Sequence, residues 1–138
     1  MSHGDRHAEI VAAAQAVRLH AYAPASRFHV GAAVRVRDGR VFVGCNVENA
    51  SYGLTICAER AAVCAAVASG AREIEAVAVA TDLIEPARPC GACRQVLAEF
   101  GIGMQVVLVG STGARVEVAL RELLPDPFTF ADVQRGQR

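Results

Sequence analysis

The chain has no lysine and no tryptophan, and its 138 residues include only two tyrosines and five phenylalanines. Its fourteen positively charged side chains are all arginines, and fourteen acidic residues balance them. A protein that binds duplex nucleic acid usually carries a clustered positive face, and a single-strand binder carries aromatic stacking platforms. Neither feature is visible, so we expect no nucleic-acid partner and favour a small-molecule ligand.

Long apolar runs are also absent, although hydrophobic residues make up 53% of the chain. No run approaches the roughly 20 residues that cross a membrane as a helix, so we expect no membrane partner. The first six residues lack the charged-then-apolar pattern of a secretory signal, which favours a cytoplasmic protein. The length suits one domain over residues 1–138, and the high apolar content indicates burial in an assembly.

The five cysteines are an odd number, which argues against a disulfide framework in a cytoplasmic protein. Cys45 and Cys64 lie among apolar residues, and we expect both to be ordinary buried thiols. The other three belong to motifs. Cys57 opens the string Cys-Ala-Glu-Arg, and Cys90 and Cys93 form a C-x-x-C within Pro-Cys-Gly-Ala-Cys-Arg-Gln. The sequence therefore offers three thiols to one metal ion.

These thiols, together with Glu59, predict a catalytic zinc site. A structural Zn²⁺ site has four protein ligands, whereas a catalytic site keeps one position for water. Cys57, Cys90 and Cys93 supply three ligands, so the open position would hold water, and Glu59 would move its protons. The C-x-x-C alone also fits a thioredoxin-like redox pair or part of a zinc ribbon. The redox interpretation leaves Cys57 and Glu59 unexplained, and a ribbon would need a second C-x-x-C.

Hydrophobic periodicity predicts helices that alternate with strands. The expected helices cover about residues 5–21, 57–69 and 91–100, with a helical turn at 120–124. The expected strands cover 28–37, 41–43, 74–80, 105–109 and 115–118. Beyond its first turn the helix from residue 57 is apolar on every side, which predicts burial in the core and at a subunit contact. Together these elements indicate an α/β or α+β domain of three layers with about five strands.

The two metal motifs resemble those of the cytidine deaminase family, in its small three-cysteine type. The resemblance extends, in the family's order, to Ala21–Pro24, Phe28–Ala33, Gly44–Tyr52 and Glu122–Pro125. It implies an α/β/α domain with a mixed five-stranded sheet and with both metal motifs opening helices on one side. The implied activity is zinc-dependent hydrolytic deamination of cytidine and 2′-deoxycytidine to uridine and 2′-deoxyuridine, with release of ammonia, in pyrimidine salvage.

The resemblance also assigns a role to each candidate residue. It makes Glu59 the proton shuttle and Zn²⁺ the cofactor, and it places Arg60 beside the metal-bound sulfur. The expected substrate contacts are Phe28, Asn46, Glu48, Ala58 and Phe128. The family forms homotetramers with shared sites, in which an aromatic residue of the C-terminal segment closes a neighbour's pocket. Phe128 is the matching residue, with Phe130 as the alternative.

One position departs from the family's pattern, because Ala25 stands where many members have a tyrosine. The change puts in doubt a contact near the pocket mouth or the subunit boundary. The main competing activity is deamination of another cytosine nucleoside, such as blasticidin S, whose deaminases share the Pro-Cys-Gly-x-Cys-Arg-Gln string. The stretches Asn46–Asn49 and Phe28–Ala33 favour the ordinary nucleoside.

Overall fold

A computed structural model describes residues 4–136, so residues 1–3 of the segment inspected for a secretory signal lie outside the described chain. Five strands form a mixed sheet in the order β2-β1-β3-β4-β5. Their bounds are β1 Val30–Val36, β2 Val41–Cys45, β3 Ile74–Thr81, β4 Gln105–Val109 and β5 Arg115–Ala119. Only β3 and β4 run parallel, and the other neighbours are antiparallel. The predicted mixed five-stranded sheet is therefore confirmed.

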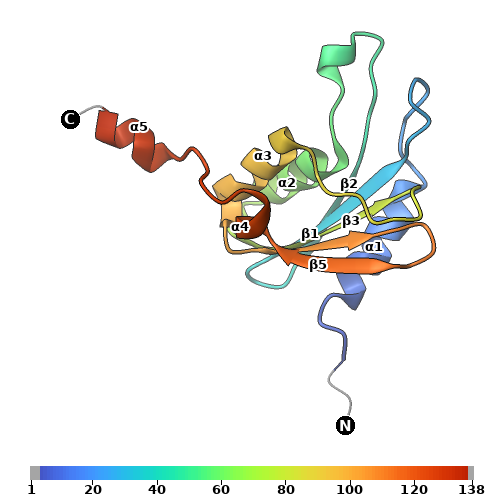
Figure 1. Ribbon diagram of the computed structural model, residues 1–138, viewed down its shortest axis with the longest axis horizontal. Coiled ribbons are helices and arrows are strands. Elements are labelled where there is room, and N and C mark those ends of the chain that lie inside the picture. Colours follow the sequence, from blue (N-terminus) through green and yellow to red (C-terminus); the bar gives the residue numbers. More distant parts are fainter. Residues whose placement is uncertain (1–3, 137–138) are drawn as a thin grey trace.

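Helices cover both faces of this sheet (Figure 1). Their bounds are α1 Ala8–Arg18, α2 Ala58–Ala68, α3 Gly91–Gly101, α4 Leu120–Leu123 and α5 Phe130–Gly136. The helix α1 packs on one face, while α2 and α3 pack on the other, and α5 extends away from the rest of the chain (Figure 1). The three layers follow the alternation of side chains along the strands.

The strand β1 shows how the two layers of core form. Val34 and Val36 point to the face of α2 and α3, where they join Val63 and Leu97. Ala33 points to the opposite face and packs with residues of α1. Alternate side chains of a strand point to opposite faces, so one apolar strand supplies both cores. The apolar strand β3 lies at the centre of the sheet, between β1 and β4.

Two strand glycines allow the helices to approach the sheet closely. A Cβ at Gly44 of β2 would lie 2.4 Å from the main-chain nitrogen of Ala62 in α2. A Cβ at Gly31 of β1 would lie 2.1 Å from the carbonyl oxygen of Ala14 in α1. Any side chain at either position would push a helix off the sheet. Gly44 thus sets the position of the helix that begins directly after Cys57.

The expected burial of α2 in the core is confirmed for one face, and its burial at a subunit contact stays a prediction. The helix buries Ala62, Val63 and Ala66, while Ala65 and Ala68 on the outer face are exposed in the described chain. The expectation that Cys45 and Cys64 are buried thiols is wrong for this chain. Cys64 is exposed on this outer face, and Cys45 is only half-buried. An apolar helix shows that its faces avoid water, but its sequence does not distinguish the sheet of its own chain from another surface.

The helix α5 was not predicted, although its start carries a capping signal. The main-chain N–H of Thr129 donates to Asp132 Oδ2 at 2.8 Å, and the N–H of Asp132 donates back to the Thr129 hydroxyl at 3.4 Å. This Thr-x-x-Asp pattern is a capping box with aspartate in place of glutamate. Within residues 4–136, no helix combines the length and the apolar character that a bilayer span requires.

Candidate active site

Buried polar side chains mark one place in the described chain. Five polar or charged residues are buried in the described chain, and four of them line a single cavity of about 240 Å³. These four are Asn46, Glu48, Glu59 and Thr81. Burying polar groups costs free energy unless they are satisfied or used, so such a concentration points to a binding or catalytic site.

Two of the three motif cysteines, Cys57 and Cys90, line this cavity, and the third, Cys93, lies next to them. The Sγ atoms of Cys57, Cys90 and Cys93 all lie within 4.8 Å of one another. Tetrahedral Zn²⁺ with Zn–S bonds of about 2.3 Å would place its sulfur ligands roughly 3.8 Å apart, so the group suits one ion. Thiolate ligands select zinc, copper(I) or iron–sulfur clusters over hard cations. The three thiols that sequence spacing brought together are therefore confirmed as a potential metal-binding group.

Two helix starts converge on these sulfur atoms. Cys57 is the N-cap of α2 and Cys90 is the N-cap of α3. The N–H of Cys93 points at Cys90 Sγ, 3.5 Å away. Helix N-termini carry partial positive charge, which stabilises thiolates and offsets the negative charge that three of them bring to a metal.

The cysteine pKa values respond to this setting in different directions. Burial raises the pKa of the Cys57 and Cys93 thiols. Burial also opposes ionisation of Cys90, but hydrogen bonds from the N–H and thiol of Cys93 outweigh it and lower the pKa of Cys90.

Glu59 lies in the first turn of α2, two residues after Cys57, and its side chain lines the cavity. Only 5% of the residue is exposed, and burial raises the pKa of its carboxyl group. A carboxyl group with a raised pKa can accept a proton and later release it near neutral pH. Ala58 precedes it, is fully buried and also lines the cavity.

Glu48 reaches the cavity from the segment after β2, and a turn of the chain wraps around its carboxylate. The main-chain N–H groups of Ala25 and Ser26 donate to Oε1 at 2.8 and 3.1 Å, and the Ser26 hydroxyl donates to Oε2. The Ser26 hydroxyl is the main reason that the pKa of Glu48 is lowered. Successive N–H groups around an anion form a nest that keeps it charged. The contact through the Ala25 main chain does not require a tyrosine at that position.

Asn46 uses its side chain to hold the chain beside the pocket. Its Nδ2 donates to the carbonyl of Phe28 at 2.8 Å, and its Oδ1 accepts from the N–H of Val30 at 2.9 Å. Phe28 itself is half-buried and lines the cavity. Phe28, Asn46 and Glu48 therefore line the same cavity as Cys57 and Glu59.

Two predicted site residues lie elsewhere in the described chain. Arg60 is half-buried in the first turn of α2 and does not line the cavity, and its predicted place beside the metal-bound sulfur stays a prediction. Phe128 is 65% exposed and also lies outside this cavity, in the segment that leads to α5. The site of one chain is therefore assembled without Phe128.

Two residues without a predicted role, Arg94 and Gln95, make main-chain contacts beside the site. Arg94, directly after the C-x-x-C, donates to the carbonyls of Pro89 and Leu123 at 2.8 and 2.9 Å. Gln95 Nε2 donates to the carbonyl of Phe128 at 2.8 Å. The Arg-Gln pair ending the metal motif thus ties the C-terminal segment to the metal-binding loop. Their position inside the motif is the signal that could have identified them.

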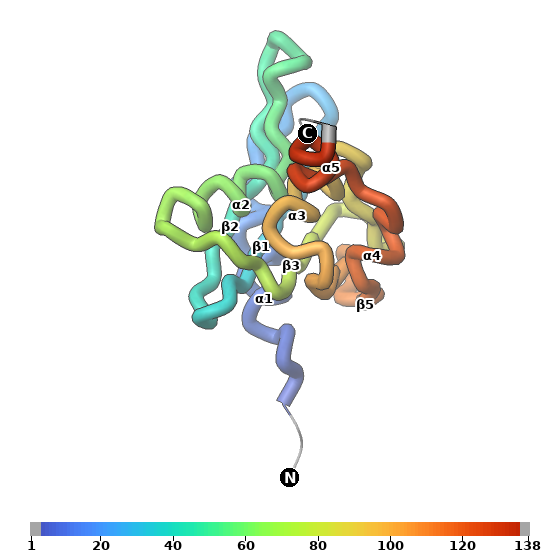
Figure 2. Tube along the Cα trace, turned by 90° about the vertical axis from the view of Figure 1, so that its left-hand side faces the viewer, coloured from blue at the N-terminus to red at the C-terminus, as the bar shows by residue number. Residues whose placement is uncertain are grey.

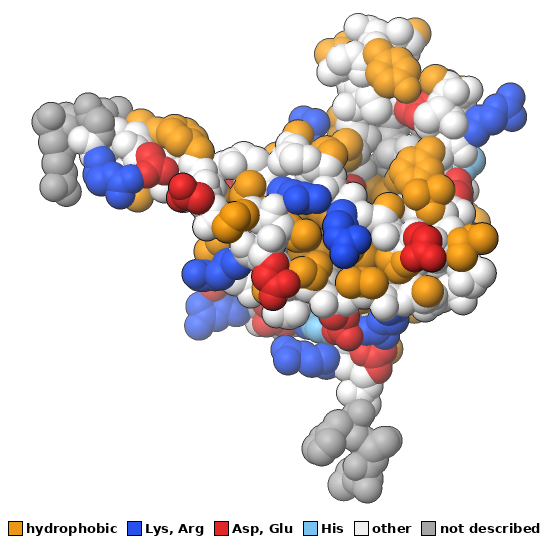
Figure 3. Space-filling view, viewed as in Figure 1, with side chains coloured by type: hydrophobic (Ala, Val, Ile, Leu, Met, Phe, Trp, Pro, Cys, Tyr) orange, Lys and Arg blue, Asp and Glu red, His pale blue; other side chains and the backbone are white. Residues whose placement is uncertain are grey.

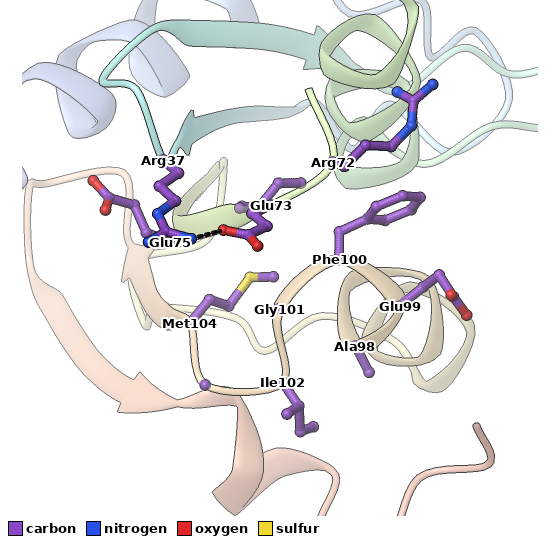
Figure 4. Close-up of a pocket in the computed structure, with 12 residues that line it drawn as sticks. Arg37, Arg72, Glu73, Glu75, Ala98, Glu99, Phe100, Gly101, Ile102 and Met104 are labelled. Atoms are coloured by element: carbon purple, nitrogen blue, oxygen red, sulfur yellow. Dashed lines mark hydrogen bonds and ion pairs between the residues drawn. The ribbon is translucent and has the colours of Figure 1, made fainter. Parts of the chain in front are cut away.

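A larger hollow of about 660 Å³ lies away from these groups, between the start of β3 and the end of α3 (Figure 4). An ion pair of 2.7 Å between Arg37 and Glu73 crosses its wall (Figure 4). Both partners are exposed, and none of the motif cysteines and none of the buried polar residues lies in its lining. We therefore assign the chemistry to the smaller cavity.

Known proteins share this arrangement. The family model for the cytidine and deoxycytidylate deaminase zinc-binding region matches residues 4–109. A cytidine deaminase of Halalkalibacterium halodurans is 48% identical over 130 residues, which cover 94% of this chain and 98% of that protein. A cytidine deaminase of Mycobacterium tuberculosis is 48% identical over 118 residues, which cover 86% of each chain.

Solved structures agree with the sequence matches. The crystal structure of cytidine deaminase from Burkholderia pseudomallei superposes with a TM-score of 0.86 at 49% identity, covering 90% of this chain and all of that chain. The structure from Mycobacterium tuberculosis gives a TM-score of 0.78 at 43% identity, covering 90% and 98%. The chain therefore belongs to the cytidine and deoxycytidylate deaminase family.

Proposed function

We propose that this protein deaminates cytidine and 2′-deoxycytidine by hydrolysis, giving the uracil nucleosides and ammonia. The observation that carries the proposal is the cluster of three cysteine thiols, two of which line the same cavity as the buried carboxyl of Glu59. A redox function of Cys90 and Cys93 would not account for the third thiol at Cys57 or for Glu59. The name cytidine deaminase, borne by relatives 44–48% identical over most of the chain, supports the same activity.

The cofactor that suits the cysteine group is Zn²⁺, held by Cys57, Cys90 and Cys93. When bound it supplies a Lewis acid that acidifies a water molecule for attack on C4 of cytosine. Glu59 takes up one proton of this water and passes it to the ring nitrogen N3. It then transfers the second proton of the same water to the amino group, which leaves as ammonia. Its raised pKa suits both directions of transfer. One water adds and one ammonia departs, so the overall reaction is balanced.

Three other residues that line the cavity bind and orient the nucleoside in this proposal. Phe28 packs against the base, and Asn46 and Glu48 face the ribose hydroxyl groups. The lowered pKa of Glu48 keeps a carboxylate there, which accepts hydrogen bonds from hydroxyls and repels a phosphate. Unphosphorylated nucleosides are therefore the expected substrates.

We further propose that the chain is one catalytic domain over residues 1–138 that assembles as a homotetramer with shared sites. Exposed aromatic residues support assembly, because Tyr22, Tyr52, Phe128 and Phe130 each expose more than half of their surface. Apolar side chains gather at the tip of the segment between β2 and α2 (Figure 3). The cavity of about 240 Å³ falls below the usual range of roughly 300–1,000 Å³, as expected if a neighbour completes it.

The test combines a metal determination with an activity assay on one sample. Protein purified without added metal is expected to hold one zinc per chain and to consume cytidine in an ultraviolet assay. The variant Glu59→Gln is expected to keep its zinc and lose at least ~10²-fold in turnover. Active protein without zinc would contradict the metal assignment, and near-normal turnover of the variant would place the proton shuttle elsewhere.

A further inference from the structure

Asp82 lies outside the cavity, yet both of its carboxylate oxygens make contacts close to it. It directly follows Thr81, the last residue of β3, whose side chain lines the cavity. Its Oδ2 accepts from the main-chain N–H of His29 at 2.8 Å and lies 2.8 Å from His29 Nδ1. Its Oδ1 accepts from Arg18, the last residue of α1. Asp82 thus joins the ends of α1 and β3 to the residue that follows Phe28.

Phe28 enters the cavity before the ladder of β1 begins, so side chains must fix its backbone. The N–H of Phe28 donates to the Ser26 hydroxyl at 3.0 Å, and its carbonyl accepts from Asn46. The next N–H, that of His29, donates to Asp82. Asn46 and Asp82 therefore hold the peptide group that links Phe28 to His29 by its two ends, since one binds its carbonyl and the other its N–H.

The carboxylate of Asp82 is suited to this task because it is charged. Burial alone would raise its pKa, but hydrogen bonds from the main chain and ring of His29 and from Arg18 outweigh burial and lower it. Charge-assisted hydrogen bonds are shorter and stronger than neutral ones. Arg27, just before Phe28, has a φ of 58°, in the left-handed region that non-glycine residues rarely adopt. The backbone conformation before Phe28 is therefore strained, and the surrounding hydrogen bonds must stabilise it.

We propose that Asp82 is a positioning residue for the deamination, holding Phe28 against the substrate base through the main-chain N–H of His29. The inference rests on the proposed function and adds to it a residue that does not touch the substrate. It differs from a purely structural role, in which Asp82 would only tie α1 to the sheet through Arg18. The two roles predict different kinetics.

The test is a double-mutant cycle on the zinc-loaded enzyme, well below its unfolding temperature. Asp82→Ala and Phe28→Ala are each expected to raise KM for cytidine about tenfold or more, with a smaller change in kcat. The double variant is expected to match Phe28→Ala within about twofold, because Asp82 acts only through Phe28. Effects that multiply in the double variant would overturn the proposal.

Two matched variants separate positioning from stability. Arg18→Gln removes the tie to α1 and is expected to lower the unfolding temperature while leaving KM within about twofold. His29→Ala removes the ring but keeps the main-chain N–H, so it is expected to change KM less than Asp82→Ala does. A rise in KM for Arg18→Gln equal to that of Asp82→Ala would show that Asp82 is structural only.

A variant that keeps an acceptor guards against misfolding. Asp82→Asn retains an oxygen for the His29 N–H without the charge, so it is expected to give an intermediate KM and replaces Asp82→Ala in the cycle if that variant does not fold. The activity of the wild type in the same assay separates a failure of the proposed function from a failure of the positioning role. Inactive zinc-loaded wild type would refute the proposed function, whereas an active wild type with multiplicative effects would refute only the positioning role.

Discussion

Two of the side chains that line the cavity also hold the fold around it. The side-chain amide of Asn46 makes hydrogen bonds with the backbone of Phe28 and Val30. The carboxylate of Glu48 accepts hydrogen bonds from the turn at Ala25 and Ser26. A carboxylate held by several donors has little freedom to rotate, so the atoms that face the cavity are already oriented before a ligand arrives. Such preorganisation lowers the entropy lost on binding.

The charge of Glu48 gives a prediction about substrate range. Cytidine 5′-monophosphate is expected to react much more poorly than cytidine, because a phosphate would approach a fixed carboxylate. Glu48→Gln is expected to raise KM for cytidine at least about tenfold, since hydrogen bonds to charged groups contribute roughly 1.5–3 kcal/mol. It is also expected to narrow the gap between nucleoside and monophosphate.

Steady-state kinetics with both substrates measure this effect. Glu122→Gln, at an exposed position outside the cavity, removes the same charge and is expected to leave both KM values unchanged. A wild-type enzyme that preferred the monophosphate would show that Glu48 does not face the ribose.

At the scale of elements, the start of α1 is held over the sheet by a buried histidine. His7 precedes α1 and is only 3% exposed. Its Nδ1 lies 3.3 Å from Nη2 of Arg35 in β1, and a guanidinium can only donate, so Nδ1 must be the acceptor. The proton of the neutral ring then sits on Nε2, which faces Glu117 of β5 at 3.5 Å.

Charged groups from every neighbouring element face this ring. Arg35 also donates to Glu75 of β3 at 2.7 Å and to the Arg6 carbonyl at 2.8 Å. Arg115 of β5 pairs with Asp5. Burial first, and then the charge of Arg35, lower the pKa of His7 below its ordinary value of 6.5, with Glu117 acting in the opposite direction. A second proton on the ring would place a donor against the guanidinium.

The lowered pKa predicts acid destabilisation of this element. Below about pH 6.5 the unfolded chain binds a proton at His7 that the folded chain does not, so the free energy of unfolding falls as pH falls towards the folded pKa. The slope from one group is at most about 1.4 kcal/mol per pH unit. His7→Gln, which keeps an acceptor for Arg35, is expected to show a flatter decline between pH 7 and 5.

Urea unfolding of both proteins with saturating zinc measures the difference. Acid weakens zinc binding to cysteines in both proteins equally, so the comparison cancels that contribution. Parallel declines in wild type and variant would show that His7 has a similar pKa in the folded and unfolded states.

At the scale of the whole molecule, the chain leaves apolar surface on three separate parts. These are the outer face of α2, the segment between β2 and α2, and the C-terminal segment with Phe128 and Phe130. The second of these projects beside the chain that leads into β1, and isolated bridges join Tyr22, Val47 and Ile56 (Figure 2). A projecting apolar segment favours contact with another copy over exposure to water.

Shared sites predict complementation between two defective chains. Phe128→Ala subunits keep Glu59 but lack the aromatic residue that they would lend, and Glu59→Gln subunits lack the proton shuttle but still lend Phe128. When both are co-expressed, some pockets should receive both intact parts. Activity above the average of the two parents is therefore expected.

The mass of the mixed oligomer, measured by light scattering, provides the control for this experiment. Verified mixed tetramers that show no gain, from strongly impaired parents, would place Phe128 in its own subunit's site. The same substitution at Phe130 tests the alternative aromatic residue. A monomer as the active species would refute the assembly itself.

The motifs were enough to predict the cluster of three thiols, and hydrophobic periodicity predicted the two helices that begin beside them. Cys57 and Cys90 occupy the N-cap positions of α2 and α3. The mixed sheet also followed from the resemblance. The position of Phe128 relative to a neighbouring pocket stays a prediction, since it concerns a second chain.

Other features could not be predicted because their partners are distant in sequence. An acid after a strand looks like a solvated loop residue, and only the fold brings Asp82 to His29, 53 residues away. Exposure of Cys64 depends on which side of an apolar helix meets the sheet. Hydrogen bonds to main-chain groups, such as those of Asn46, cannot be predicted from the sequence, because every residue carries the same main-chain groups.

The anchors of the C-terminal segment have a consequence for sequence divergence. Arg94 and Gln95 hold that segment by the carbonyl oxygens of Leu123 and Phe128, and every amino acid supplies such an oxygen. Side chains after residue 123 can therefore be exchanged while the chain keeps its path along the metal-binding loop. Substitutions of the aromatic residues there would change what the segment presents to a neighbouring subunit without loss of the anchor, which makes this segment the natural place to vary the proposed contact with a neighbour's pocket by directed evolution.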